Sequence, residues 1–138
     1  LIALSNNHPL ANQKYIKAAD FSEQTLITYP VNQDRLDIFT RFLDPAAIEP
    51  KEVRTADLTL MMIQLVASGR GIAALPNWAI YDYLQKGYIT GRPIGERGQW
   101  CTLYAAIRDE QKNAEFMSDF LETAKEVSFA NLAGIKSA

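Results

Sequence analysis

The strongest pattern of apolar and polar positions in the chain lies between residues 58 and 75. Apolar residues recur there at the spacing of one helical face, at Leu58, Met61, Met62, Leu65 and Val66. Gly69 then stands where a left-handed residue usually ends a helix. Residues 72–75 are apolar without alternation, which is typical of a strand buried on both faces. The pattern therefore predicts a helix that leads into a central strand.

Similar patterns predict the other elements of the chain. Strands are expected at residues 1–5, 25–29, 52–55, 89–94 and 100–108. Helices are expected at residues 33–43, 78–85 and 113–127. The first of these would begin at Asn32 as N-cap and bury Leu36, Ile38, Phe39, Phe42 and Leu43. The last would bury Phe116, Phe120, Leu121, Ala124 and Val127. Alternating strands and helices predict an α/β fold with a mostly parallel sheet and flanking helices.

Three places follow a predicted strand and precede a predicted helix, at residues 30–32, 55–57 and 76–78. In α/β sheets, ligands bind beyond the carboxyl ends of the strands. The first turn of each helix would offer unpaired backbone N–H groups and the positive end of the helix dipole. Three such helix ends at one edge of a sheet predict a site for a small carboxylate.

The composition is that of an ordinary globular domain and excludes several classes of function. Of the 138 residues, 48% are apolar and 22% are charged, and the net charge is −2. This balance gives the segment no basic surface for nucleic acid or for an acidic membrane. Cys101 is the single cysteine, so an intrachain disulfide is excluded. No apolar run reaches the length of roughly 18 residues that a membrane span needs.

No set of residues for catalysis or metal binding stands out. His8 is the only histidine, and within the sequence NNHP a turn role is the favoured interpretation. No serine stands in a nucleophile motif, so an enzyme is not expected. No metal and no cofactor are expected either.

Three other side chains allow both a structural and a functional interpretation. Arg35 could meet a carboxylate in a cleft, or it could be a solvated surface cation. Asp57 could hold an ammonium group, or it could compete with Thr55 as N-cap of the helix that follows. Trp78 could cover a ligand, or it could pack at an interface.

Several segments together resemble the LysR-type transcriptional regulators. They are HPLA at residues 8–11, LITYPV at 26–31, RLDIF at 35–39, LMMIQLVASGRGIAALPNW at 60–78 and WCTLYAAIRD at 100–109. The resemblance covers about residues 4–129, nearly the whole chain. YPV with RLD, ALP with the tryptophan two residues on, and LYAAIR are most similar to the branch that regulates methionine biosynthesis.

The resemblance implies a two-lobed effector domain with the type II fold of periplasmic binding proteins. It also implies a winged helix-turn-helix domain before this chain. Because the chain opens without methionine in what reads as the middle of a strand, we expect a fragment that lacks its N-terminal part. Residues 1–26 and 100–138 would belong to the first lobe, and residues 27–99 would form the second. The hinge strands would be residues 26–29 and the start of 100–104.

The resemblance further implies homocysteine as co-effector, bound between the lobes of a cytoplasmic homodimer or tetramer that contacts DNA only through the absent domain and contacts no membrane. Its second-lobe contacts would lie at the strand ends selected above, with Arg35 as the candidate cation. The predicted ligand-binding residues are Thr28, Tyr29, Pro30, Asn32, Arg35, Thr55, Asp57, Leu75 and Pro76. The alternative is a periplasmic amino-acid-binding protein of the same fold, which an apolar leader upstream would indicate.

Overall fold

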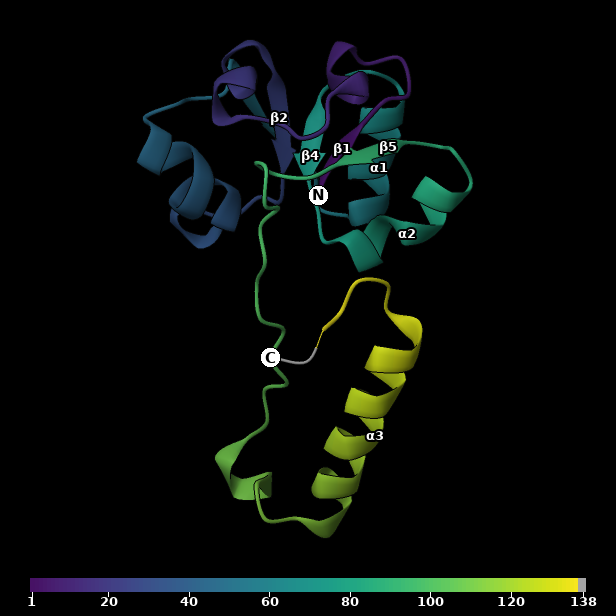
Figure 1. Ribbon diagram of the computed structural model, residues 1–138. Helices are drawn as coiled ribbons and strands as arrows, with labels where there is room; N and C mark the ends of the chain where they lie inside the picture. The colour runs from purple at the N-terminus through teal and green to yellow at the C-terminus, as the bar shows by residue number, and fades with distance from the viewer. Residues whose placement is uncertain (137–138) are drawn as a thin grey trace. The chain divides into compact units, whose positions relative to one another are not determined.

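Five short strands form one mixed sheet in the computed structural model, which describes residues 1–136 (Figure 1). The strands are β1 (Ile2–Leu4), β2 (Thr25–Thr28), β3 (Glu52–Thr55), β4 (Ile72–Ala74) and β5 (Thr90–Arg92). Their order across the sheet is β3-β2-β4-β1-β5. The strand β2 pairs in parallel with β3 and β4, whereas β1 pairs antiparallel with β4 and β5. The α/β fold is confirmed, but the sheet is mixed rather than mostly parallel.

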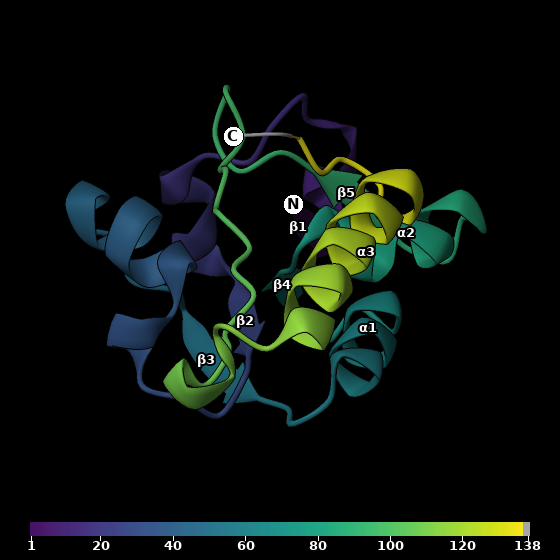
Figure 2. The same ribbon diagram turned by 90° about the horizontal axis from the view of Figure 1, so that it is seen from below.

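Helices cover both faces of this sheet. The helices α1 (Thr59–Ala67) and α2 (Asn77–Gln85) lie on one side, and the short helical turns between residues 33 and 46 lie on the other (Figure 2). One buried cluster joins the sheet to α1 and α2 through Ile27, Met62, Val66 and Ile80. A second cluster on the opposite face includes Phe21, Leu26, Phe39 and Leu43. Two apolar clusters on opposite faces explain why Ile72 and Ala73 of β4 are both buried.

The helix α1 is rotated relative to the face that the sequence predicts, so Met62 and Val66 reach the core and Leu65 packs against it, whereas the other predicted core residues do not. Its buried residues are Met62, Ile63 and Val66, whereas Leu58 and Met61 are 61% and 53% exposed. Six of its nine residues are Leu, Met, Ile or Val. Because apolar residues occur all round this helix, the sequence does not define which side packs against the sheet.

The single helix predicted at residues 33–43 is wrong. The structure has a 3-10 turn at Gln33–Arg35, an extended Leu36 with φ −111° and ψ 113°, and then a π-helical turn at Phe39–Leu43. A second 3-10 turn, Asp44–Ala46, contains Pro45. The extended residue breaks the helix, yet Phe39 and Leu43 still reach the core at 3% and 0% exposure. Asn32 precedes only the three-residue turn, and its side chain makes no capping hydrogen bond.

Turn residues behave as the sequence predicts. Gly69 and Gly87 follow α1 and α2 with φ of 72° and 64°, in the left-handed region that favours glycine. The Nδ1 atom of His8 accepts a hydrogen bond from the Leu10 backbone N–H at 3.2 Å. Its Nε2 atom lies 3.1 Å from Oε1 of Gln24. His8 therefore stabilises the NNHP turn and its contact with the segment before β2.

The chain divides into two compact units, Leu1–Gln99 and Trp100–Ala138. Residues 1–26 and 27–99 lie in one unit, where β1 stands inside the sheet between β4 and β5. The predicted assignment of these residues to two lobes and the hinge at residues 26–29 stay predictions, and β2 is a central strand between β3 and β4. The predicted boundary between residues 99 and 100 coincides with the division of the structure.

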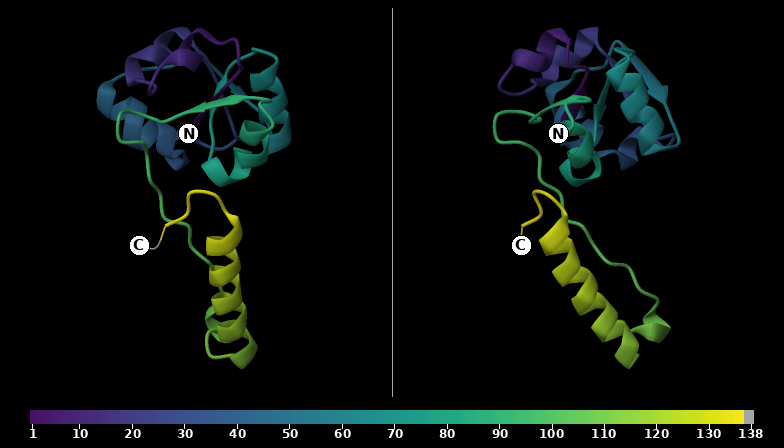
Figure 3. Two further views of the ribbon diagram at one scale, coloured as in Figure 1. Left: turned by 45° about the vertical axis from the view of Figure 1, so that its right-hand side comes forward. Right: turned by 90° about the vertical axis from the view of Figure 1, so that its right-hand side faces the viewer.

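The second unit contains a 3-10 turn, Asp109–Gln111, and one helix, α3 (Glu115–Asn131) (Figure 3). The helix is confirmed, with its ends shifted by two to four residues from the predicted range of 113–127. The strand predicted at residues 100–108 is wrong, because these residues have no regular secondary structure and all are exposed. A strand needs a neighbour to accept its hydrogen bonds, and none of the described strands pairs with this segment.

Candidate functional site

The carboxyl ends of three neighbouring strands meet at one edge of the sheet. Thr28 ends β2 and stands directly opposite Thr55, the last residue of β3. The strand β4 runs parallel to β2, with Ala73 opposite Ile27, so Leu75 leaves the sheet at the same edge. Leu1 lies beside it, since its backbone N and O are 3.0 and 2.9 Å from Leu75 O and N. We call Thr28, Thr55, Leu75 and Leu1 the strand-end site.

The two threonines of the site differ in exposure. Thr28 is 6% exposed and is the one buried polar residue of the described chain, and its carbonyl accepts a hydrogen bond from the Ala56 N–H at 2.9 Å. Thr55 is exposed. Tyr29 is partly buried, and its hydroxyl lies 2.6 Å from the hydroxyl of Thr59 in the first turn of α1. This contact ties the end of β2 to the start of α1.

Asp57 does not cap α1, and neither does Thr55. The N-cap position is Leu58, an extended residue with φ −118° and ψ 135°, and no side chain makes a capping hydrogen bond. Asp57 is exposed and makes no hydrogen bond or ion pair within residues 1–136. The chain therefore leaves a free carboxylate next to the strand-end site.

The residues after β2 offer fewer groups for binding a ligand than the sequence predicts. Pro30 and Asn32 are exposed, and the turn that follows has only three residues. Such a turn has no helix dipole of useful size, so it offers little to an anion. Arg35 is exposed, and its side chain has no hydrogen-bond or ion-pair partner in the described part of the chain, although its backbone N–H donates to the Asn32 carbonyl at 3.0 Å. The structure leaves its guanidinium free but does not bring it against the other site residues.

Leu75 and Pro76 connect β4 to α2. Leu75 is 3% exposed, and Pro76 is exposed and occupies the N-cap position of α2. The helices α1 and α2 both start at the carboxyl edge of the sheet, and each has nine residues. Two helix N-termini, rather than the three predicted, therefore point their positive ends at this edge.

Glu52 and Arg54 on β3 form an ion pair with each other. Nε of Arg54 donates to Oε1 of Glu52 at 2.9 Å. The hydrogen bond from Arg54 lowers the pKa of Glu52 from its ordinary value, and the same bond raises the pKa of Arg54. Both side chains stand on the exposed edge strand, so the pair is a surface feature rather than part of the strand-end site.

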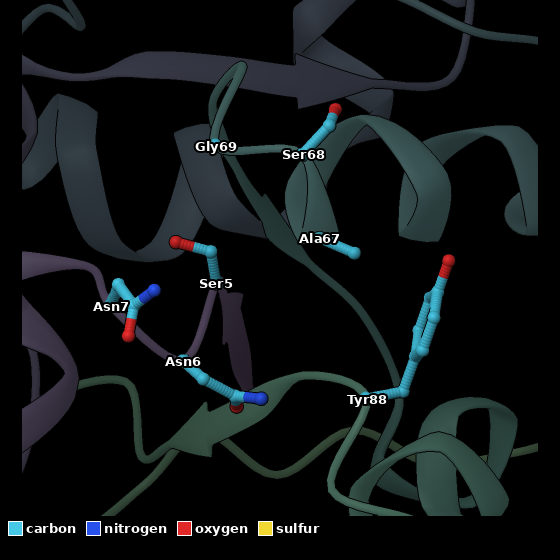
Figure 4. A pocket seen from close by; sticks show the side chains of 7 residues that line it. All are labelled: Ser5, Asn6, Asn7, Ala67, Ser68, Gly69 and Tyr88. Atoms are coloured by element: carbon cyan, nitrogen blue, oxygen red, sulfur yellow. The ribbon is translucent and has the colours of Figure 1, made fainter.

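A shallow polar pocket of about 320 Å³ lies at the opposite edge of the sheet. Ser5, Asn6 and Asn7 line it from the loop after β1, and Ala67, Ser68, Gly69 and Tyr88 complete it (Figure 4). Because β1 runs antiparallel to β4, the loop after β1 lies where β4 begins rather than where it ends. Sequence reasoning missed this pocket, because its polar residues after β1 and the end of α1 are more than 55 residues apart in the chain.

Within residues 1–136, no three His, Cys, Asp or Glu side chains lie close enough together to hold a metal ion. Among the same residues, no helix is both long and apolar enough to cross a membrane.

Comparison with known proteins finds similar domains. The family model described as the LysR substrate binding domain matches residues 1–128. The chain is 45% identical over 131 residues to the HTH-type transcriptional regulator MetR of Haemophilus influenzae, covering 95% of the chain and 42% of the relative. It is 37% identical over 137 residues to MetR of Escherichia coli K12, covering 99% of the chain and 43% of that relative. The chain thus spans less than half the length of these relatives. Both are named as regulators and not as enzymes, in agreement with the absence of a catalytic motif.

Solved structures give the same result. The regulatory domain of MetR from Neisseria meningitidis superposes with a TM-score of 0.89 at 42% identity, covering 99% of this chain and 63% of that domain. The effector-binding domain of BenM with benzoate superposes with a TM-score of 0.71 at 18% identity, which supports the fold alone. The chain therefore has the fold of LysR substrate-binding domains.

Proposed function

Since the chain belongs to the family of LysR substrate-binding domains, we propose that it senses homocysteine in a DNA-binding regulator of methionine biosynthesis. The observation that carries this proposal is the pairing of Thr28 with Thr55 at the carboxyl edge, beside the starts of α1 and α2. That edge is where ligands of α/β proteins bind. The identity of 37–45% to proteins named MetR supports the choice of regulator.

The polar groups of the strand-end site suit an amino acid. The α-carboxylate of homocysteine would lie at the start of α1 or α2, where unpaired N–H groups and the helix dipole favour an anion. The buried hydroxyl of Thr28 and the hydroxyl of Thr55 would add hydrogen bonds. The carboxylate of Asp57, which has no partner among the described residues, would receive the ammonium group.

The proposed mechanism is a shift between two arrangements of the lobes. Homocysteine would bind between the lobes and favour one interlobe angle, which the oligomer would pass to the DNA-binding domains. The ligand can shift this equilibrium only by the difference between its affinities for the two arrangements. The homodimer or tetramer, the DNA-binding domain and the cytoplasmic location belong to this proposal for the whole protein. A periplasmic amino-acid-binding protein is not favoured, because the matched relatives are named as transcriptional regulators.

Calorimetry of the full-length regulator tests the proposal, with homocysteine titrated against methionine and cysteine. We expect selective binding of homocysteine. Asp57→Asn should weaken that binding about tenfold, because it removes the charge that pairs with the ammonium group. Asp34→Asn is the matched control, since Asp34 is also an exposed aspartate but lies in the turn after β2. If a folded regulator binds none of the three amino acids, the ligand assignment is wrong.

A further inference from the structure

Three large apolar side chains remain exposed at the strand-end site. Val31, Leu58 and Trp78 are 42%, 61% and 39% exposed. Each follows within three or four residues of the last residue of a strand, namely Thr28 of β2, Thr55 of β3 and Ala74 of β4. We call Val31, Leu58 and Trp78 the apolar rim.

The topology starts the three segments that carry the rim at the same edge of the sheet as the polar residues of the site. The strands β3, β2 and β4 are neighbours and run in parallel, so the segments that follow them start side by side at intervals of about 5 Å. Leu58 directly follows Asp57 and is the N-cap residue of α1. Trp78 is the second residue of α2, whose first turn also faces this edge.

The fold itself does not need the rim. The cluster that packs α1 and α2 onto the sheet is built from Met62, Ile63, Val66 and Ile80, and neither Leu58 nor Trp78 belongs to it. The hydrophobic effect favours burial of such side chains, at about 1.5–3 kcal/mol for each that is fully covered. Apolar groups beside a few convergent polar groups are the usual lining of a small-molecule site.

We propose that the apolar rim receives the side chain of the amino-acid effector and selects a thiol over a hydroxyl. This inference rests on the proposed function, in which Thr28, Thr55, Asp57 and the helix starts hold the carboxylate and ammonium groups. A thiol behaves as a small apolar group with a weak donor, so it enters apolar surroundings at little cost. A hydroxyl without a hydrogen-bond partner is penalised there by roughly 1–3 kcal/mol.

The test compares homocysteine with homoserine, which has the same carbon chain and carries a hydroxyl in place of the thiol. By calorimetry on the full-length regulator, we expect homoserine to bind about tenfold more weakly. Leu58→Gln should weaken homocysteine binding and leave homoserine binding nearly unchanged, so that the preference disappears. Leu60→Gln is the matched control, because Leu60 is 52% exposed in α1 but lies two residues further from the strand end.

The outcomes separate this inference from the proposed function. If homocysteine and homoserine bind with equal affinity, the apolar rim does not select the side chain, while the effector role stands. The inference is also wrong if Leu58→Gln lowers the affinity for both amino acids equally, or if Leu60→Gln removes the preference as completely. If neither amino acid binds to the folded regulator, the proposed function fails and the inference fails with it. Homoserine binding by each variant also reports that the variant is folded.

Discussion

The two units of the chain present similar apolar patterns with opposite results. In residues 1–99, Phe21 is fully buried and its ring meets that of Phe42 at 6.0 Å between centroids. In the second unit, Phe120 stands on a well-formed helix and is 62% exposed. Phe116 and Val127 of the same helix are 63% and 53% exposed. A helix therefore forms in both units, but only the first unit provides a surface that covers its apolar side chains.

The difference shows that an apolar pattern specifies which face of an element needs a cover, but not what covers it. The helix α3 contains no buried residue, and Trp100, beside which Lys136 Nζ lies 4.0 Å from the ring centroid, is 54% exposed. The regulatory domain that the chain matches is longer, since the chain covers 63% of it. We expect the remainder of such a domain to pack on α3 and to pair with residues 100–108.

The largest expected effect separates the two units directly. Phe21→Ala should lower the free energy of unfolding of the first unit by about 3–5 kcal/mol, because it leaves a cavity in a packed core. Phe120→Ala should change it by less than about 0.5 kcal/mol, as expected for a surface position. Urea denaturation followed by Trp78 fluorescence, in a Trp100→Phe background, measures both. Equal effects of the two substitutions would contradict the difference between the units.

A second comparison lies within the first unit, between two glycines. A Cβ on Gly71 would lie 2.6 Å from the backbone oxygen of Thr25 in the neighbouring strand β2, whereas a Cβ on Gly69 would meet nothing within 4 Å. Gly71→Ala should therefore destabilise the unit by more than about 2 kcal/mol, since backbone would have to move. Gly69→Ala should lower the free energy of unfolding by about 1 kcal/mol, because alanine is strained at a φ of 72°. Thermal unfolding of the two variants in parallel measures which substitution destabilises the protein more. A larger loss of stability for Gly69→Ala than for Gly71→Ala would contradict the prediction.

The surface pair on β3 should give a smaller effect that depends on pH. Because Arg54 lowers the folded-state pKa of Glu52, the pair stabilises the protein above the ordinary carboxyl pKa. That contribution is lost as pH falls through the lowered value. Arg54→Gln should raise the pKa of Glu52 toward its ordinary value and should change stability little, because both side chains are exposed. An NMR titration of the Glu52 carboxyl carbon measures this, and an unchanged pKa would show that the pair does not form in solution.

The smallest expected effect is that of urea on the reactivity of the Cys101 thiol, which we expect to be accessible in the folded chain already. Its side chain is exposed in a segment without regular structure, so its thiol should react with a colorimetric disulfide reagent at nearly the same rate with or without urea. In the longer regulatory domain, we expect urea to accelerate the reaction, since residues 100–108 would then be paired. Strong protection in the 138-residue chain would show that this segment is covered already.

The sequence predicted the elements whose neighbours lie within the chain, and it also predicted α3, which has no buried residue. The strands β2, β3 and β4 and the helices α1 and α2 are found within a few residues of their expected ends, because their apolar patterns match a core that the chain itself builds. The phase of α1 could not be predicted, since apolar residues surround the helix. The break at Leu36 could not be predicted either, because the spacing of Ile38, Phe39 and Leu43 fits a regular helix. The structure buries these three side chains although no regular helix forms.

The candidate site was predicted in part. Thr28, Thr55, Leu75 and Pro76 gather at one edge because parallel strands end together, which follows from the order of elements alone. The N-cap residue of α1 could not be predicted. The backbone is extended at Leu58, so the helix begins one residue later than it would with Asp57 as its cap. The apolar rim was predicted only at Trp78, which was expected either to cover a ligand or to pack at an interface. Leu58 was missed because its helical spacing assigned it to the core.

One measurement tests the central claim that the strand-end site, and not the pocket at the opposite edge, holds the effector. Homocysteine would be titrated into the isotope-labelled regulatory domain while backbone amide shifts are recorded. The account predicts that the amides of Thr28, Thr55, Asp57 and Asn77 shift together and saturate with one dissociation constant, whereas that of Asn6 in the polar pocket does not move. Saturable shifts at Asn6 with none at the strand ends would contradict it.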